Sequence, residues 1–225
     1  MRRRSRLHFL LEGIEGIVIT TAVLISWSFS KRWLRHWGSH LQERERVWPG
    51  DQYVSSNHET YTRAIDIDAP ADSVWPWIVQ FGLGRAGFYS YELLERIAGI
   101  PVVNVESIEP SMQSLTIGDE ILLHPKAPGI PVADLEPGRR ICFGVRDDAD
   151  TTVSRSDPAR SWSIYVEPVS DTSCRLLLRG CIESPREPTW LKRIGGALEA
   201  PIDFVMEQRM IRTIKRLAEE LTVIS

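Results

Sequence analysis

The neighbouring stretches SWSIYVEPVSD at residues 161–171 and TSCRLLLRGCIES at residues 172–184 decide the fold of this chain. Both are rich in β-branched, aromatic and aliphatic residues and are bounded by Asp, Ser and Thr, a pattern typical of strands that end in turns. A connection this short can join only antiparallel strands. The pair therefore predicts a β-hairpin near the C-terminal end of the sequence.

Further strands precede this hairpin. Residues 60–70, TYTRAIDIDAP, alternate with a period of two and end at a proline, which predicts the first strand. Three more segments with turn residues at their ends predict strands at residues 116–125, 130–138 and 139–147. We therefore expect an antiparallel sheet of six or seven strands.

Three helices complete the pattern. Residues 73–81 carry apolar side chains at helical spacing, and residues 88–101 carry a second apolar stripe that ends at Gly99. A long C-terminal helix is predicted over residues 194–223, where apolar residues recur every three or four positions. A run of strands followed by a helix indicates an α+β fold, with a curved sheet wrapped around the long helix. The space between the two is the natural place for a ligand.

The charge distribution argues against nucleic acid as a partner. The first 37 residues hold seven basic and two acidic side chains, which leaves 20 basic and 28 acidic ones, a net charge of −8, on the rest. Such a body repels a phosphate backbone. The three cysteines, Cys142, Cys174 and Cys181, form no C-x-x-C pair, and we expect them to be buried thiols in a reducing compartment.

Residues 1–37 predict a hydrophobic helix with basic flanks. Residues 9–29 contain only Glu12 and Glu15 as charged side chains, and 21 helical residues cover about 31 Å, enough to cross a bilayer. We expect a membrane-spanning anchor, with an apolar core made of Ile17, Val18, Ile19, Val23, Leu24, Ile25 and Trp27.

We expect this anchor to hold the domain at the inner membrane, in the reducing cytoplasm, although the nearly balanced basic flanks do not set an orientation. Two other arrangements stay open, namely an amphipathic helix lying in the membrane interface and a helix packed on its own domain. The polar residues 38–59 contain a Pro-Gly-Asp turn signal and are predicted to link the helix to a ligand-binding domain at residues 60–225.

The segment from Gly82 to Gly87 matches the dinucleotide-binding pattern G-x-G-x-x-G. That motif requires a buried strand directly before the first glycine, whereas here the preceding segment contains Pro76 and begins with a helix-start signal. We therefore interpret these glycines as a loop between two short helices, and we expect no nucleotide or other cofactor.

Several segments together carry a family resemblance. They are the stretch TRAIDIDAPADSVWPWIVQFGLGRAGFYSYELLERIAG at residues 62–99, the IGDEILLHP segment, the EPGR turn at residues 136–139 and PIDFVMEQRMIRTIKRLAE at residues 201–219. Over roughly residues 48–220 the chain resembles bacterial members of the SRPBCC superfamily, which comprises START-like, polyketide cyclase-like and Bet v 1-like proteins. The resemblance implies the helix-grip fold, with a mainly apolar cavity for lipids, sterols or polyketides. It does not imply one activity, because the superfamily includes carriers, sensors and aromatase/cyclases.

The candidate ligand-binding residues lie in three parts of the chain. The GRAGFYSYE segment offers a guanidinium and two phenols that can orient a polar head group, and the strands and the last helix offer apolar contacts. The set comprises Arg85, Tyr89, Tyr91, Phe143, Trp162, Val205 and Met206.

The candidates for acid–base catalysis are Tyr89, Tyr91 and His124. His124 is the only histidine after residue 59, so we expect no metal site. Asp203 and Glu207 form a like-charge pair one helical turn apart, which calls for a cation such as Arg63 or Arg179. Packing or surface roles stay open for all of these residues.

The leading functional hypothesis is the binding of a hydrophobic small molecule by a membrane-tethered domain. The alternative is a cyclase- or aromatase-like enzyme that uses one of these tyrosines or His124 in the same cavity. A third possibility is an interaction protein whose interior is filled by its own side chains. Hydrolase and phosphoryl-transfer motifs do not occur in the sequence.

Overall fold

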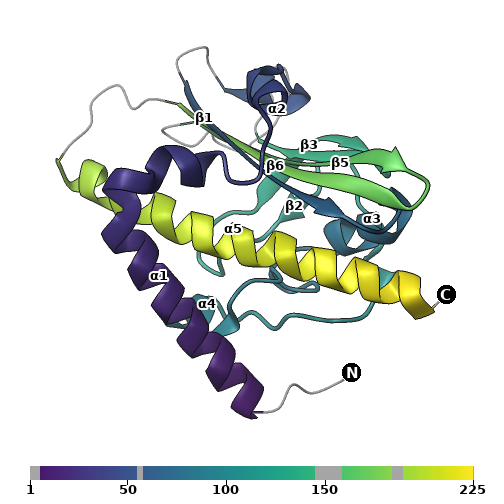
Figure 1. Ribbon diagram of the computed structural model, residues 1–225, viewed down its shortest axis with the longest axis horizontal. Coiled ribbons are helices and arrows are strands. Elements are labelled where there is room, and N and C mark those ends of the chain that lie inside the picture. The colour runs from purple at the N-terminus through teal and green to yellow at the C-terminus, as the bar shows by residue number, and fades with distance from the viewer. Residues whose placement is uncertain (1–5, 55–57, 145–158, 184–189, 225) are drawn as a thin grey trace.

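The computed structural model describes residues 6–54, 58–144, 159–183 and 190–224. Figure 1 shows a sheet crossed on one side by the long C-terminal helix, with the N-terminal helix lying beyond that helix. The helical elements are α1 (Arg6–Arg35), α2 (Leu41–Glu45), η1 (Pro49–Tyr53), α3 (Ala71–Val79), α4 (Glu92–Ile97), η2 (Pro110–Met112) and α5 (Trp190–Ile224). The strands are β1 (His58–Ile67), β2 (Glu120–Ile121), β3 (Ile130–Glu136), β4 (Arg140–Phe143), β5 (Arg160–Ser170) and β6 (Ser173–Glu183).

The described strands form one antiparallel sheet in the order β1-β6-β5-β4-β3-β2. The predicted hairpin is confirmed as β5 and β6, which pair from Arg160 opposite Ile182 to Ser170 opposite Ser173. The first strand, β1, forms one edge of the sheet and pairs with the last strand, β6, along its whole length. The α+β prediction, with a curved sheet around a long C-terminal helix, is confirmed.

One strand is shorter than its pattern predicts. Of residues 116–125 only Glu120 and Ile121 pair in the sheet. The Asp119 carboxylate accepts the backbone N–H of Thr116, and Gly118 has a φ of 94°, so the preceding residues form a turn. The alternating apolar residues that favoured a longer strand include Leu122 and Leu123, which are exposed.

The two faces of the sheet are covered by different parts of the chain. On the inner face, α3 and α5 pack against β4, β5 and β6 around the main apolar cluster. On the outer face, Trp48 and Tyr53 are buried against Tyr165 and Leu177. Residues 38–54, which were expected to be a linker, therefore form α2 and η1 and cover the sheet.

Charged groups join this outer layer to the sheet. Arg179 donates from Nε to one Asp51 carboxylate oxygen over 2.6 Å, and Arg175 pairs with Glu43 and with Asp66. These arginines point outward because alternate residues of a strand face opposite sides of the sheet. The polar composition of this segment suggested a linker. Composition alone does not distinguish solvated polar side chains from polar side chains that form ion pairs with the sheet, as Glu43 and Asp51 do.

The glycine-rich segment is a closed loop, as expected. Gly82 and Gly87 exchange backbone hydrogen bonds of 3.0 and 3.1 Å, and the segment lies between α3 and α4. An added Cβ at Gly87 would lie 2.8 Å from the Val103 carbonyl oxygen, so this position requires glycine. The motif therefore serves the packing of two short helices.

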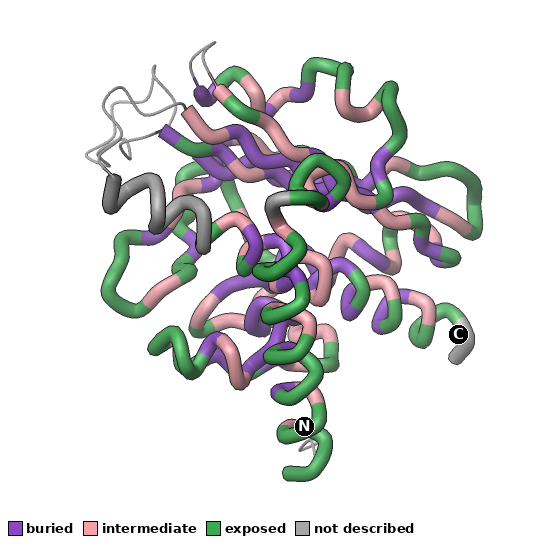
Figure 2. Tube along the Cα trace, turned by 60° about the vertical axis from the view of Figure 1, so that its left-hand side comes forward, coloured by how far each residue is buried: buried purple, intermediate pink, exposed green. Residues whose placement is uncertain are grey.

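Helix α1 packs against α4 and α5 on the side of α5 that faces away from the sheet (Figure 1). Its Val23 and Leu34 are buried with Phe204 and Val205 of α5. Residues Arg6–Trp27 are long and apolar enough to cross a membrane, and most of that window is exposed. Figure 2 shows α1 as a mostly exposed rod that stands out from the body at its N-terminal end.

Candidate ligand-binding interior

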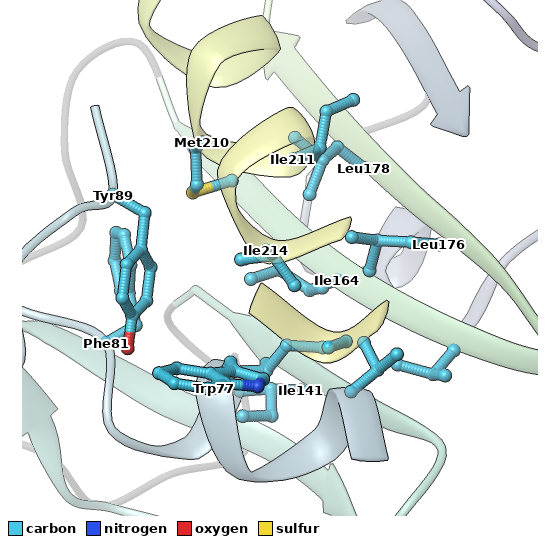
Figure 3. Packing of buried hydrophobic residues seen from close by; sticks show 14 of the residues in the cluster. Trp77, Phe81, Tyr89, Ile141, Ile164, Leu176, Leu178, Met210, Ile211 and Ile214 are labelled. Carbon is cyan, nitrogen blue, oxygen red and sulfur yellow. The ribbon is translucent and has the colours of Figure 1, made fainter. Parts of the chain in front are cut away.

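The candidate site is the region between the inner face of the sheet and α5. Its aliphatic wall comes from both layers, because alternate strand residues and one side of α5 face each other there. Figure 3 shows these side chains pointing toward one another. The wall consists of Ile141, Ile164, Leu176 and Leu178 from the sheet and Met210, Ile211 and Ile214 from α5.

An aromatic wall completes the region on the side of α3 and the loop that follows it. The Trp77 ring meets the Tyr89 ring edge to face, with centroids 6.1 Å apart. Phe81 lies 5.5 Å from Trp162, and Trp162 stacks on Phe143 at 5.4 Å. Rings from four separate elements thus meet in one cluster.

The hydroxyl of Tyr89 is oriented by Gln80, a fully buried amide. Gln80 Oε1 accepts the backbone N–H of Glu109, and its Nε2 donates to the carbonyl of Ser107, so the orientation of the amide is fixed by backbone groups. Nε2 also donates to Tyr89 Oη over 2.8 Å. The phenol oxygen is therefore an acceptor here, and its own proton is left to donate elsewhere.

The backbone turn that directs Tyr89 inward is held by Asn104. Its Oδ1 accepts the backbone N–H groups of Phe88 and Tyr89 over 3.0 and 2.7 Å, and its Nδ2 donates to the carbonyl of Ser90. Tyr89 has a φ of 56°, a left-handed conformation that is rare and strained for a residue with a ring. Sequence reasoning missed both Asn104 and Gln80, because nothing local marks an amide that binds a turn far away in the sequence.

Two further donors in this cluster have no acceptor among the described residues. They are the indole N–H groups of Trp77 and Trp162, whose nitrogen atoms are buried. A buried donor left without a partner costs on the order of 1–3 kcal/mol. The interior is thus apolar in its walls and rich in unused donors.

The structure separates the residues that the sequence analysis grouped together. Tyr89, Phe143 and Trp162 share the interior. Arg85 lies at its edge, where Nη2 donates to the backbone carbonyls of Val79 and Met112 over 3.0 and 2.7 Å. Its guanidinium therefore ties the end of α3 to η2.

Tyr91, Val205 and Met206 lie in a second cluster, on the α1 side of α5. The Tyr91 hydroxyl donates to Glu15 of α1 over 3.2 Å, and the Arg209 guanidinium lies over its ring at 5.1 Å. Desolvation by burial and the nearby Glu15 carboxylate raise the pKa of Tyr91 to about 12. These three residues therefore face a helix of the same chain.

His124 lies in the connection between β2 and β3. Its Nδ1 accepts the backbone N–H of Lys126 over 3.1 Å at an exposed position. It thus lies apart from the two tyrosines that were named with it. Within the described ranges no group of three or more His, Cys, Asp or Glu side chains is placed to hold a metal ion.

The like-charge pair on α5 lies between α5 and β1. Arg63 pairs with Glu207, whose other carboxylate oxygen accepts the Tyr61 hydroxyl over 2.6 Å. Arg63 thus meets the expected need for a cation. Burial, and then the neighbouring Glu207 and Glu199 carboxylates, raise the pKa of Asp203 to about 7.

The order of elements decides the fold. A first strand is followed by two short helices, by a run of antiparallel strands and by a long helix that crosses the inner face of the sheet. This chain has the helix-grip fold. The resemblance expected from the sequence is confirmed at the level of the fold.

No family model matches the chain, and no curated protein matches it. Similar solved structures include a polyketide_cyc-like protein of Corynebacterium glutamicum, at 14% identity and a TM-score of 0.35, over 75% of this chain and 94% of that one. An aromatase/cyclase of Streptomyces sp. R1128 matches at 14% identity and a TM-score of 0.36, over 72% and 94% of the two chains.

A third similar structure is an HSP90 activator of Plasmodium falciparum, at 12% identity and a TM-score of 0.35, over 61% of this chain and 85% of that one. Identities and TM-scores this low carry no functional argument. The function of this helix-grip chain is therefore argued from its own residues.

Proposed function

We propose that this chain binds an apolar small molecule of the lipid, sterol-like or polyketide-like kind between the sheet and α5. The observation that supports the proposal is the pair of buried indole donors of Trp77 and Trp162, which have no acceptor among the described residues and lie in the same cluster as the Tyr89 hydroxyl that Gln80 orients. A ligand with carbonyl, ether or hydroxyl oxygens supplies acceptors for these donors, and the surrounding apolar walls hold its hydrocarbon part.

Binding requires Tyr89 only as a hydrogen-bond donor, whereas acid–base catalysis requires it to transfer its proton. Desolvation by burial raises the pKa of this phenol well above its ordinary value, so at neutral pH it keeps its proton and serves as a donor. Tyr91 and His124, the other candidate catalysts, lie outside the interior. Of the three residues named for catalysis, Tyr89 is the one in the interior, where its protonated phenol can donate to a bound ligand.

The proposal places the protein at a membrane, with α1 as the point of attachment. The support is the length and mean hydropathy of residues Arg6–Trp27, together with the basic residues around them. A cytoplasmic position on the inner membrane is supported by the three cysteines, which are free and buried. A domain that holds a water-insoluble molecule gains access to it at the bilayer.

The test is native mass spectrometry of the full chain, purified in a mild detergent and incubated with oleic acid, cholesterol or 9,10-anthraquinone. We expect an adduct with at least one of these molecules and a five- to tenfold weaker affinity for it in Tyr89→Phe, which loses about 1 kcal/mol of hydrogen bonding.

Tyr91→Phe is the matched control. It removes the same hydroxyl two residues away, on the α1 side of the molecule, and its affinity is expected to stay within about twofold of the parent. The absence of any adduct, or equal weakening by both substitutions, contradicts the proposed interior site.

A further inference from the structure

Helix α1 has two faces with opposite surroundings. The face turned to the domain is fixed by specific contacts, since Glu12 pairs with Arg209 and Glu15 accepts the Tyr91 hydroxyl. Close contact requires glycine at Gly13 and Gly16, where an added Cβ would lie 2.2 Å from Leu93 Cδ2 and 2.9 Å from Tyr91 Cγ. These contacts lie in the middle of the segment that is long enough to span a bilayer.

The opposite face is an exposed apolar stripe. Its members follow one another at intervals of three, four or seven residues, so they project to the same side of the helix. Val18 on this stripe is 61% exposed, whereas Val23 on the domain side is 9% exposed. We define the α1 stripe as Leu7, Leu11, Ile14, Val18 and Ile25, all of them exposed.

A bilayer-spanning position conflicts with these contacts. In the docked arrangement, a membrane around the middle of α1 would also surround α4, which carries Glu92, Glu95 and Arg96, and the Arg209 side chain of α5. Charged side chains at that depth cost several kcal/mol each. Release of α1 from the domain would instead expose Phe204 and Val205, which are buried under it.

Basic side chains stand at both ends of the α1 stripe. Arg6 lies at its start, and Lys31 and Arg32 follow its end, all three exposed. Trp33, which is 62% exposed, stands beside them, as aromatic residues do at the lipid headgroup level. A helix with an apolar stripe and basic ends complements an anionic lipid surface.

We propose that α1 lies in the plane of an anionic membrane surface, with the α1 stripe in the lipid and its other face docked to α4 and α5. The inference rests on the proposed membrane attachment and specifies its geometry. In this arrangement the whole length of the stripe sits at one depth, and the domain rests on the membrane with α4 and α5 beside it.

The experiment measures the depth of single spin labels on the full chain, purified from membranes and reconstituted in vesicles of phosphatidylcholine and phosphatidylglycerol. Labels are attached at Leu11→Cys, Val18→Cys and Ile25→Cys. The native thiols are buried, and burial raises the pKa of Cys174 to about 11 and of Cys181 to about 12, so brief labelling at neutral pH reaches the introduced cysteine.

We expect equal depths for the three labels. They lie seven residues apart on one face, so a spanning helix would place Val18 and Ile25 at depths that differ by about 10 Å. Ser26→Cys is the control, since it neighbours Ile25 in the sequence but lies on the flank of the helix. An in-plane helix places the Ser26 label clearly shallower than the Ile25 label, whereas a spanning helix places them within about 2 Å of each other.

The remaining outcomes separate the two proposals. Depths that follow the sequence order overturn the in-plane geometry and leave the membrane attachment standing. Labels that report no lipid, on a chain recovered from the soluble fraction, overturn the attachment as well. Strong coupling between labels on a soluble dimer shows that a second copy covers the α1 stripe, and it also overturns the proposal.

Discussion

The two sides of α5 are built on different principles. On the sheet side, the interior combines apolar walls with the indole donors of Trp77 and Trp162, which lack acceptors among the described residues. On the α1 side, charged groups of α1 are paired, as in the bonds of Glu12 with Arg209 and of Glu15 with Tyr91, although the Thr20 hydroxyl is buried without a partner in the part of the chain that the structure describes. The α1 side is therefore a contact between parts of the chain, whereas the interior is the region in which we propose that a ligand supplies acceptors.

The largest effect on stability is expected at the contact between α1 and α5. Phe204→Ala removes a ring that is 2% exposed between α5 and α1, and we expect a loss of about 4 kcal/mol in the free energy of unfolding. Urea unfolding of the full chain measures it. Phe29→Ala removes the same ring at a position that is 95% exposed and should change this free energy by less than about 0.5 kcal/mol without a membrane. Equal effects would mean that α1 does not dock on α5.

The second largest effect is expected from loss of the turn that directs Tyr89 and Tyr91 to different regions. Asn104→Ala leaves two backbone N–H groups and one carbonyl without their side-chain partner, and we expect a loss of about 3 kcal/mol in the free energy of unfolding. Ligand affinity in the native mass spectrometry assay should fall with it, because Tyr89 loses its inward direction. An Asn104→Ala chain with unchanged affinity would show that the turn does not position Tyr89.

The pH dependence of stability sharpens the description of the region between α5 and β1. The pKa of Asp203 is raised in the folded chain to about 7, so the unfolded chain ionises this carboxyl first and stability falls as pH rises from about 4 to about 7. We expect Asp203→Asn to stabilise the protein relative to the parent, by on the order of 2 kcal/mol more at pH 8 than at pH 5.

Urea unfolding at the two pH values checks this expectation. The substitution Asp68→Asn is a control, because that side chain is 88% exposed and its change should stay below about 0.5 kcal/mol at both pH values. A benefit of Asp203→Asn that is larger at pH 5 would refute the assignment.

The smallest effect concerns one ion pair on the α1 side. Glu12→Gln removes the charge that faces Arg209, and because both side chains are partly buried we expect a loss of about 1 kcal/mol in the free energy of unfolding. Glu220→Gln provides the comparison. The Glu220 side chain, which pairs with Arg216, is 57% exposed, so the loss in the free energy of unfolding should be smaller. A stabilising effect of Glu12→Gln would contradict the description of the α1 side as a contact that is held by paired charges.

The sequence predicted the elements better than the groups they form. The hairpin, the long C-terminal helix and the glycine loop follow from patterns that repeat within a few residues, and the structure has all three. Of the seven candidate ligand-binding residues, however, the structure brings only Tyr89, Phe143 and Trp162 together. The polarity of residues 38–54 likewise indicated a linker, although ion pairs such as Asp51 with Arg179 hold this segment on the sheet.

The type and order of the elements follow from the amino-acid sequence alone, because hydrophobic periodicity and the placement of Pro and Gly act over one turn or one strand. The sequence also shows that residues 6–27 are apolar enough for a membrane. Only the tertiary structure decided that Tyr89 faces the interior while Tyr91 faces α1. The direction of Tyr89 is set by Asn104, which lies more than ten residues further along the chain. Hydrophobic periodicity shows that α5 has apolar sides, but it does not show which element packs against each side.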